Sequence, residues 1–413
     1  MIRHLAFFEV LSEEEEETPR WSAVSAGLLV MRAFDSWVEL GTVGVHASVE
    51  LAAVQKVVSQ MNNGPARALL DGILQEIRLG KRSPEAVLPR LLAYARCLHF
   101  DGDLTLATDV TSRVVELARM YSDDDVTDDL TLGALQQLGL TLRMQGSMDQ
   151  AEITYAELER RSNAAGDTAR VLRARIGMAK LMLARGNLPA AELMLDDVVA
   201  DARANGLPMV AGVALHDRAA VAHARGDHSS AVRLLFDALH VTEDSASRDG
   251  VLGDLAANLM SLGAYAPARD ALVVLSLTAQ EGVRRQLAEI NLMELATLEQ
   301  NQLSFEHHRQ LLAAQGFPPE YGAHYHLYAA RGLLSFGRNS ALVREELTRA
   351  RKIAVEHDYN QLQFLIDDVE AALESGEREA EGRKVPVQEE FAGQFDDVVE
   401  VLSGLRAEAE MAT

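Results

Sequence analysis

Apolar residues recur at every third or fourth position along most of the chain, the spacing that places them on one face of an α-helix. The first stripe of this kind runs from Trp21 to Leu40 and consists of Val24, Leu28, Met31, Phe34 and Trp37. Glycine and asparagine residues end this stretch and the two that follow it. The pattern predicts helices over 21–40, 48–60 and 65–79.

From residue 87 onward, helical stretches come in pairs separated by a glycine, and an alanine follows each glycine by five positions. The pairs are Gly102/Ala107, Gly146/Ala151, Gly186/Ala191, Gly226/Ala231 and Gly263/Ala268. A glycine just past a helix end supplies a left-handed cap, and a small residue allows two helices to cross closely. Because the glycines recur about every 40 residues, the sequence predicts a solenoid of stacked helix pairs.

This pattern resembles the tetratricopeptide repeat (TPR) in its longer form of about 40 residues. The second repeat carries the family positions at Leu138, Gly139, Leu142, Gly146, Ala151 and Tyr155, and the third at Met178, Ala179, Met182, Gly186, Ala191 and Leu195. Three departures occur: Arg218 replaces an apolar residue, Asn301 replaces a glycine, and Ala341 follows Gly337 one residue early. The resemblance covers roughly 87–358. It implies an all-α, right-handed superhelical solenoid of antiparallel helix pairs that binds proteins or peptides.

We divide the chain into five segments. Residues 1–20 are expected to be a flexible acidic lead, 21–86 a helical leader, 87–375 the TPR solenoid and 376–390 a charged linker. Residues 391–409 form a C-terminal amphipathic helix. The leader is expected to cap the first repeat, since an open solenoid end would expose apolar surface; a separate docking bundle is the alternative.

The C-terminal helix has a narrow apolar seam of the heptad kind. The seam consists of Phe391, Phe395, Val398, Leu402 and Leu405. A helix with such a seam must pack against something. Capping of the last repeat is the commonest arrangement; insertion into the groove and pairing with a second copy, which would make a homodimer, stay open.

The charge balance excludes one class of function. The chain has 39 Lys and Arg against 62 Asp and Glu, a formal net charge of −23. A nucleic-acid binder needs a basic face that displaces counterions, and the stretch 45–63 has Lys56 as its one basic residue. No apolar run is long enough to span a membrane, and the start of the chain lacks the features of a signal peptide. With Cys97 as the single cysteine, these features predict a cytoplasmic protein.

The sequence offers no catalytic constellation. It contains no phosphate-binding glycine loop, no nucleophile elbow and no zinc-protease or paired-cysteine motif. The acidic loop 122–129 lacks the spacing of an EF-hand. On a helix, the side chains of His307 and His308 point about 100° apart, and His324 and His326 also diverge. We therefore expect no enzyme activity, no metal and no cofactor.

Binding is the remaining function, and the repeat register predicts where it occurs. In TPRs the first helix of each pair faces the concave surface, at positions three, six and ten before the glycine. The polar residues at or one turn from these positions are Arg96, His99, Gln136, Arg143, Arg173, Lys180, His216, His223, His324 and Arg331. None is acidic, which predicts a groove that attracts carboxylates.

The sequence therefore predicts a non-catalytic adaptor or regulatory sensor that binds an acidic or extended peptide segment. TPR regulators that sense signalling peptides also combine a helical leader with repeats of this size, and the chain is similar to them in outline. An assembly scaffold for a larger protein complex is the alternative.

Overall fold

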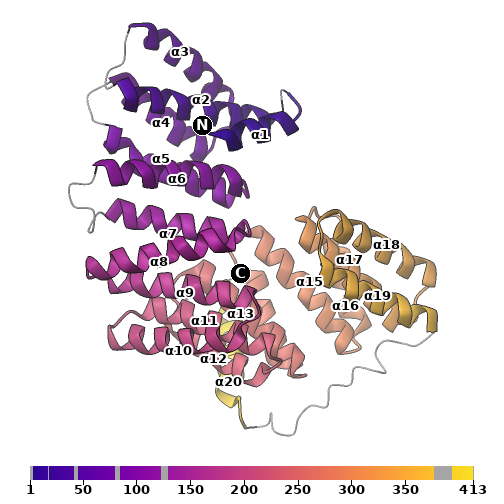
Figure 1. Cartoon of the computed structure of the whole chain (residues 1–413). Coiled ribbons are helices and arrows are strands. Elements are labelled where there is room, and N and C mark those ends of the chain that lie inside the picture. Colours follow the sequence, from indigo (N-terminus) through magenta and orange to yellow (C-terminus); the bar gives the residue numbers. More distant parts are fainter. Residues whose placement is uncertain are drawn as a thin grey trace. The chain divides into compact units, whose positions relative to one another are not determined.

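The computed structural model describes residues 3–16, 18–40, 45–79, 84–121, 129–375 and 393–412, with the side chains of 45–49 and 84 excepted. All regular structure within these ranges is helical (Figure 1). The chain divides into two compact units, Met1–Asn205 and Gly206–Thr413, and each is described by itself. The predicted all-α fold is confirmed.

The first unit holds the leader and the first three helix pairs. Its helices are α1 Leu5–Glu13, α2 Pro19–Leu40, α3 Val45–Gln60, α4 Pro65–Leu79, a 3-10 turn Pro84–Val87, α5 Leu88–Phe100, α6 Leu104–Tyr121, α7 Asp129–Met144, α8 Met148–Ala164, α9 Thr168–Ala184 and α10 Leu188–Ala204. From α4 onward each helix packs against the next. The leader helices share one continuous apolar core with α5 to α8.

The second unit holds four further pairs and two additional helices. Its helices are α11 Pro208–Ala224, α12 His228–Val241, α13 Ser245–Ser261, α14 Tyr265–Thr278, α15 Gly282–Leu298, α16 Gln302–Leu312, α17 Pro319–Ser335, α18 Ser340–Glu356, α19 Asn360–Ser375 and α20 Asp396–Ala412. Here α15 packs on α14, α16 and α17, and α19 packs on α17 and α18.

The turn inside each helix pair has the left-handed backbone that the glycine register predicts. The φ angles are 85° at Gly102, 82° at Gly146, 75° at Gly186, 74° at Gly226 and Gly263, and 64° at Gly337. A side chain is strained in this region, so glycine ends the helix at low cost. In the pair that lacks the glycine, Gln300 adopts a φ of 57° immediately before Asn301.

The alanine five residues after each glycine is fully buried. Ala107, Ala151, Ala191, Ala231 and Ala268 all have a relative exposure of 0%. Other small residues serve the same close packing: a Cβ added at Gly139 would lie 2.6 Å from Cε1 of Tyr155, and one added at Gly177 would also collide with that ring. Small side chains on α7 and α9 thus make room for the aromatic ring on α8.

The expectation that residues 1–20 are flexible is wrong. Helix α1 covers Leu5–Glu13 and packs on α2 and α6, and Phe7 is fully buried. An added Cβ at Gly27 of α2 would collide with Phe7 and with Tyr94 of α5, so Gly27 lets these rings approach the α2 backbone. The glutamate run that suggested a solvated lead therefore follows a packed helix. The remaining domain bounds stay predictions, and 376–390 lies outside the described residues.

A buried charge network fixes the start of α1. Nδ1 of His4 lies 2.5 Å from a carboxylate oxygen of Asp109 on α6, and Nε2 lies 3.2 Å from Asp35 on α2. Arg113 donates from Nε to Asp35 at 2.8 Å. Burial alone would lower the pKa of His4, but the hydrogen bonds and charges of Asp109 and Asp35 outweigh it and raise the pKa to about 9. His4 is therefore an imidazolium ion at neutral pH.

Overpacking at a repeat alanine should destabilise the second unit. We expect Ala231→Leu to lower the free energy of unfolding by roughly 1–3 kcal/mol, because the added atoms have no space between the crossing helices. Ala224→Leu is the matched control, since Ala224 is exposed in the same repeat. Urea unfolding followed by circular dichroism measures both, and equal stability of the two variants would contradict the packing assignment.

The His4 network should make stability depend on alkaline pH. A raised pKa means that the folded chain binds the proton more tightly than the unfolded chain. The contribution is present in full below pH 6.5, the ordinary pKa, and is lost as pH rises through about 9. We expect His4→Gln to be less stable than the parent chain at neutral pH and to converge on it at high pH. Parallel urea titrations across this range test the convergence; a constant stability difference would count against it.

Candidate functional site

One set of predicted binding residues comes together on the first unit. Arg96 of α5, Gln136 of α7 and Arg173 of α9 line a pocket of about 160 Å³, together with Gly133, Gln137, Leu140 and Arg170. These helices are the first members of three consecutive pairs, and α7 packs against both α5 and α9. The three residues stand six, ten and thirteen positions before Gly102, Gly146 and Gly186, so they occupy the same helix face at different turns and meet in one pocket.

The guanidinium groups of this pocket differ in how they are neutralised. Arg170 is bound by Asp129 at 2.6 Å and by Asp167 at 2.7 Å. Arg96 and Arg173 are exposed and have no hydrogen-bonding or ion-pair partner in the described ranges. Two of the three arginines thus remain available to a bound anion.

A second cationic group, around Arg143, also lies on α7. Nε of Arg143 is buried and makes no hydrogen bond within the described ranges. Nδ1 of His99 lies 3.1 Å from the hydroxyl oxygen of Thr141. Burial of His99 and the charge of Arg143 both lower the pKa of the imidazole, so His99 is neutral at pH 7. Lys180 is half-buried on α9.

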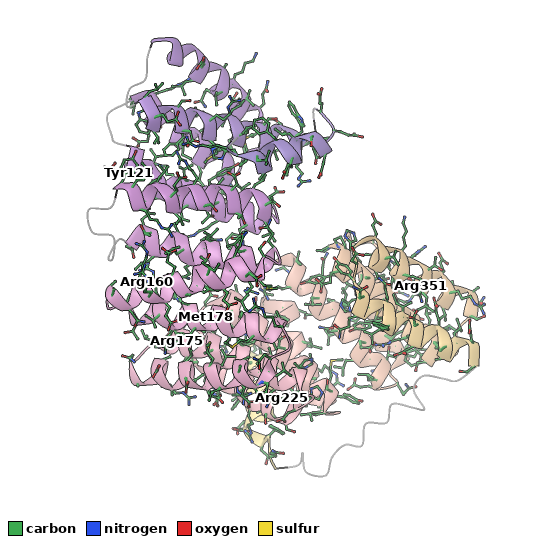
Figure 2. The ribbon with its side chains drawn as sticks, in the orientation of Figure 1. Tyr121, Arg160, Arg175, Met178, Arg225 and Arg351 are labelled. Carbon is green, nitrogen blue, oxygen red and sulfur yellow. The ribbon has the colours of Figure 1, made fainter. Side chains whose placement is uncertain are left out.

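Many other arginines of the described residues are paired with acids, and Arg96 and Arg173 differ from them in lining one pocket without such a partner. Arg175, labelled in Figure 2, binds Glu159 of α8 at 2.7 Å and Asp201 of α10 at 3.3 Å. In the second unit Arg351 binds Asp367 and Glu370 of α19. Such pairs tie neighbouring helices together and leave little charge for a ligand.

Two of the three predicted histidines of the second unit, His216 and His223, have partners on the next first helix. Nε2 of His216 on α11 lies 2.7 Å from a carboxylate oxygen of Asp254 on α13, and Nδ1 of His223 lies 3.0 Å from the amide oxygen of Asn258. Asp254 falls outside the positions that the register selected. His216 therefore has an acidic neighbour that the register did not select.

Arg331 is a core residue and not a groove residue. It is 5% exposed on α17, and its Nη1 donates to Glu294 of α15 at 3.2 Å. His324 lies seven residues, or two helical turns, before Arg331 and is half-buried. Its Nδ1 makes no hydrogen bond in the described part of the chain, and burial lowers the pKa of its imidazole. Helix α15 packs on α17 and buries the guanidinium of Arg331.

The ten predicted residues belong to two units, six to the first and four to the second. We therefore treat the two sets as separate surfaces. The prediction that all of them face one concavity stays a prediction. The set on α5, α7 and α9 is the candidate binding site.

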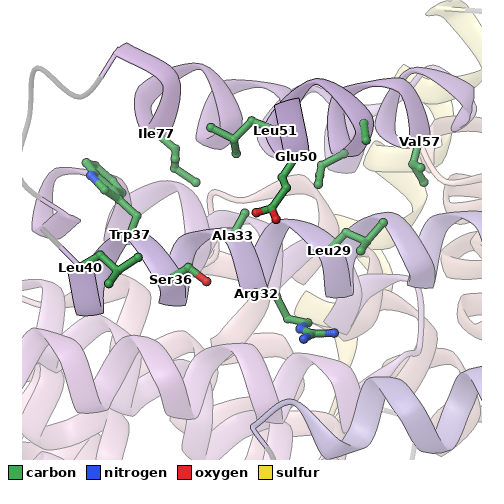
Figure 3. A pocket seen from close by; sticks show the side chains of 12 residues that line it. Leu29, Arg32, Ala33, Ser36, Trp37, Leu40, Glu50, Leu51, Val57 and Ile77 are labelled. Atoms are coloured by element: carbon green, nitrogen blue, oxygen red, sulfur yellow. The ribbon is translucent and has the colours of Figure 1, made fainter. Parts of the chain in front are cut away.

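A further cavity, of about 430 Å³, lies in the leader and was not found from the sequence. Figure 3 shows Trp37 of α2, Leu51 of α3 and Ile77 of α4 around it. Its other lining residues are Leu29, Arg32, Ala33, Ser36, Leu40, Glu50, Ala53, Val54 and Val57. The one signal in the sequence is that the apolar residues of α2 cover more than a single face.

The described residues do not form a metal site from the histidines that the sequence offered. Within those ranges, no three His, Cys, Asp or Glu side chains converge where they could hold a metal ion. His308 and His326 each bind a different glutamate, Glu289 at 2.7 Å and Glu346 at 2.6 Å. None of the described helices combines the length and apolar character needed to cross a membrane.

Comparison with known proteins places the chain by its fold. No family model and no curated protein sequence matches it. Among solved structures, RapI in its apo form is 11% identical with a TM-score of 0.50, over 80% of this chain and 99% of that one. The Rap conjugation gene regulator of the plasmid pLS20, in complex with the Phr* peptide, is 12% identical with a TM-score of 0.50, over 83% and 96%. A tetratricopeptide repeat protein from Parabacteroides merdae is 14% identical with a TM-score of 0.44, over 68% and 98%.

The chain has the TPR fold. The features of this fold in the chain are its paired helices, its left-handed glycine turns and its buried alanines. At such low identity the similarity concerns the fold alone, and many unrelated functions use TPR repeats.

Burial with an acidic partner marks a cation as structural, and Arg331 provides a test of this distinction. Removing one partner of a buried ion pair leaves an uncompensated charge, which costs about 3–5 kcal/mol. We expect Arg331→Ala to destabilise the second unit by this amount, and Arg331→Leu combined with Glu294→Leu to recover most of the loss. Chemical denaturation of the variants gives the comparison; a stable Arg331→Ala chain would return Arg331 to the list of ligand-binding residues.

Proposed function

We propose that this TPR protein is a non-catalytic adaptor or regulatory sensor that binds an extended peptide segment bearing carboxylates. The binding surface is the face of α5, α7 and α9 in the first unit. The observation that carries the proposal is the pair Arg96 and Arg173, two exposed arginines without an acidic partner among the described residues, in a chain of net charge −23.

The chemistry of the pocket favours a carboxylate. A guanidinium group offers planar paired donors that match a carboxylate, and the amide groups of Gln136 and Gln137 offer both donors and acceptors beside them. A pocket of about 160 Å³ admits an acidic side chain but not a whole peptide. The peptide would therefore lie across the three helices and place one acidic residue in the pocket.

Arg143 extends the same positive region toward the turn end of α7. Burial, together with the charge of Arg143, lowers the pKa of His99, so a second ligand carboxylate near Arg143 would meet a cation and a neutral imidazole. The net charge of −23 repels all anions at long range, acidic peptides included. Selectivity would thus come from direct contact with the arginines.

A peptide ligand is compatible with what is known of a protein with this fold. The pLS20 Rap regulator was solved with the Phr* peptide bound. The similarity shows the fold only, so it supports a peptide ligand as a class and identifies neither the peptide nor the contacts.

The scaffold alternative is favoured by the apolar cavity between α2, α3 and α4. An assembly partner would contact such apolar surface, and its binding would be insensitive to the charges of α5 and α9. The experiment below therefore separates the two functions.

Charge reversal at Arg96 and Arg173 should abolish the binding of acidic peptides. We expect each substitution by Glu to weaken binding at least about tenfold, because a charge-assisted hydrogen bond contributes about 1.5–3 kcal/mol. The probe is a pool of labelled peptides containing Asp and Glu, measured by fluorescence anisotropy at low and high salt, with Asn and Gln versions as the uncharged comparison. Binding should weaken as salt increases.

Arg160→Glu is the matched control, because Arg160 is exposed on α8, where Figure 2 labels it. Circular dichroism checks that helicity is unchanged in every variant. Equal binding of acidic and amide peptides, or loss of binding in the Arg160 control alone, would reject the proposed site.

A further inference from the structure

Helix α20, yellow in Figure 1, packs against α14 in the second unit. This differs from the capping of the last repeat, the commonest arrangement for a C-terminal helix. Of the predicted seam, Phe395, Val398 and Leu402 are buried and Leu405 is half-buried; Phe391 lies outside the described residues. Ala409 extends the buried seam toward the end of the helix.

Polar contacts at both ends fix the direction and register of α20. Arg233 of α12 donates to both carboxylate oxygens of Asp397, at 2.8 and 2.9 Å, and its guanidinium lies 4.6 Å from the ring centre of Phe395. At the other end, Arg406 donates to Asp270 of α14 at 3.0 Å. The face of α12 and α14 thus recognises an amphipathic helix by shape, by an aromatic residue and by two charges of opposite sign.

Helix α14 explains why this face is apolar. Its buried residues are Pro267, Ala268, Ala271, Leu272, Val274 and Leu275, and they point in several directions around the helix. Helices α13 and α15 cover two of its sides as repeat neighbours, and α20 covers another. The repeat order is complete without α20, so α20 occupies this face as an added ligand would.

The two ion pairs of α20 differ in exposure. The pair at its start is open to water, with side-chain exposures of 41% for Arg233 and 55% for Asp397, whereas the pair at its other end is less exposed, with 35% for Arg406 and 17% for Asp270. Exposed ion pairs contribute little to stability. Four buried side chains supply the apolar contact. A tethered helix binds in cis at high effective concentration even when its own affinity is modest.

We propose that the face formed by α12 and α14 is a docking site for an amphipathic helix of a partner protein, and that α20 occupies it in cis until the partner displaces it. The partner helix has the chemistry that α20 displays: an aromatic residue just before the helix, an acidic first turn and apolar residues spaced along one face. A second copy of the chain is a poorer occupant, because each copy carries the same net charge of −23. This docking site belongs to the second unit and the proposed peptide-binding face to the first. Either proposal can fail without affecting the other.

The test uses the full chain and a labelled synthetic peptide of residues 393–413 as the partner helix. In the chain, Phe395→Ala with Leu402→Ala weakens the cis occupant and leaves α12 and α14 intact. We expect the peptide to bind this variant roughly tenfold or more tighter than it binds the parent chain, because the cis competitor is weakened. Adding Arg233→Glu should weaken that binding, because it removes the guanidinium from the ring of Phe395 and places a carboxylate opposite Asp397, and a peptide with Asp397→Arg should restore it. Arg344→Glu, an exposed site on α18, is the matched control.

Hydrogen exchange of the parent chain supplies an independent measurement. The amides of α20 should exchange faster than those of α12 and α14, as release in the folded state requires. The proposal is overturned if α20 exchanges only as slowly as α14, if the peptide fails to bind the weakened variant, or if Arg233→Glu leaves binding unchanged. A dimer that forms by exchange of α20 between copies, seen by sedimentation, would assign the face to a second copy and also overturn it.

Discussion

Close approach of neighbouring helices at small, fully buried residues is the constraint on which the rest of the structure depends. Ala191 and Ala231 are buried completely between crossing helices. Where a large ring occupies such a crossing, glycine supplies the room, as Gly139 and Gly177 do for Tyr155. Because this spacing repeats along the chain, the first helices of successive pairs lie side by side. The pocket of α5, α7 and α9 exists for that reason.

Pairing of charges then decides which side chains are available for function. Most described arginines bind acids on neighbouring helices and fasten the stack, as Arg175 and Arg351 do. Arg331 is buried with Glu294, and Arg113 is buried with Asp35 beneath the imidazolium of His4. Arg96 and Arg173 have no acidic partner among the described residues, and they differ from other such arginines in lining one pocket together. Because the net charge of −23 repels anions, the binding of an acidic ligand would depend on direct contact with these arginines.

The two ends of the chain are both fastened by charge and by apolar contact. Helix α1 is held by the His4 network and by Phe7, and α20 is held by Arg233, Arg406 and its apolar seam. The difference lies in burial. The carboxylate of Asp35 and the imidazole of His4 are almost inaccessible to water, whereas the two ion pairs of α20 are partly exposed. The buried network holds α1, and we propose that α20 exchanges with a partner helix.

The sequence by itself determined the repeat architecture. Each turn requires a glycine and each close helix crossing a small residue, so these residues recur at a regular interval along the chain. It also predicted that Arg96, Gln136 and Arg173 share one face, because positions three or four residues apart in a helix point the same way. Only the tertiary structure decided which cations are neutralised: the pairing of Arg331 with Glu294 and of His216 with Asp254 depends on contacts between different helices. The same holds for α1, which the sequence did not predict to pack, and for α20, whose apolar seam predicted only that it must pack somewhere. What they pack against is set by complementary side chains far away in the chain, which no local pattern contains.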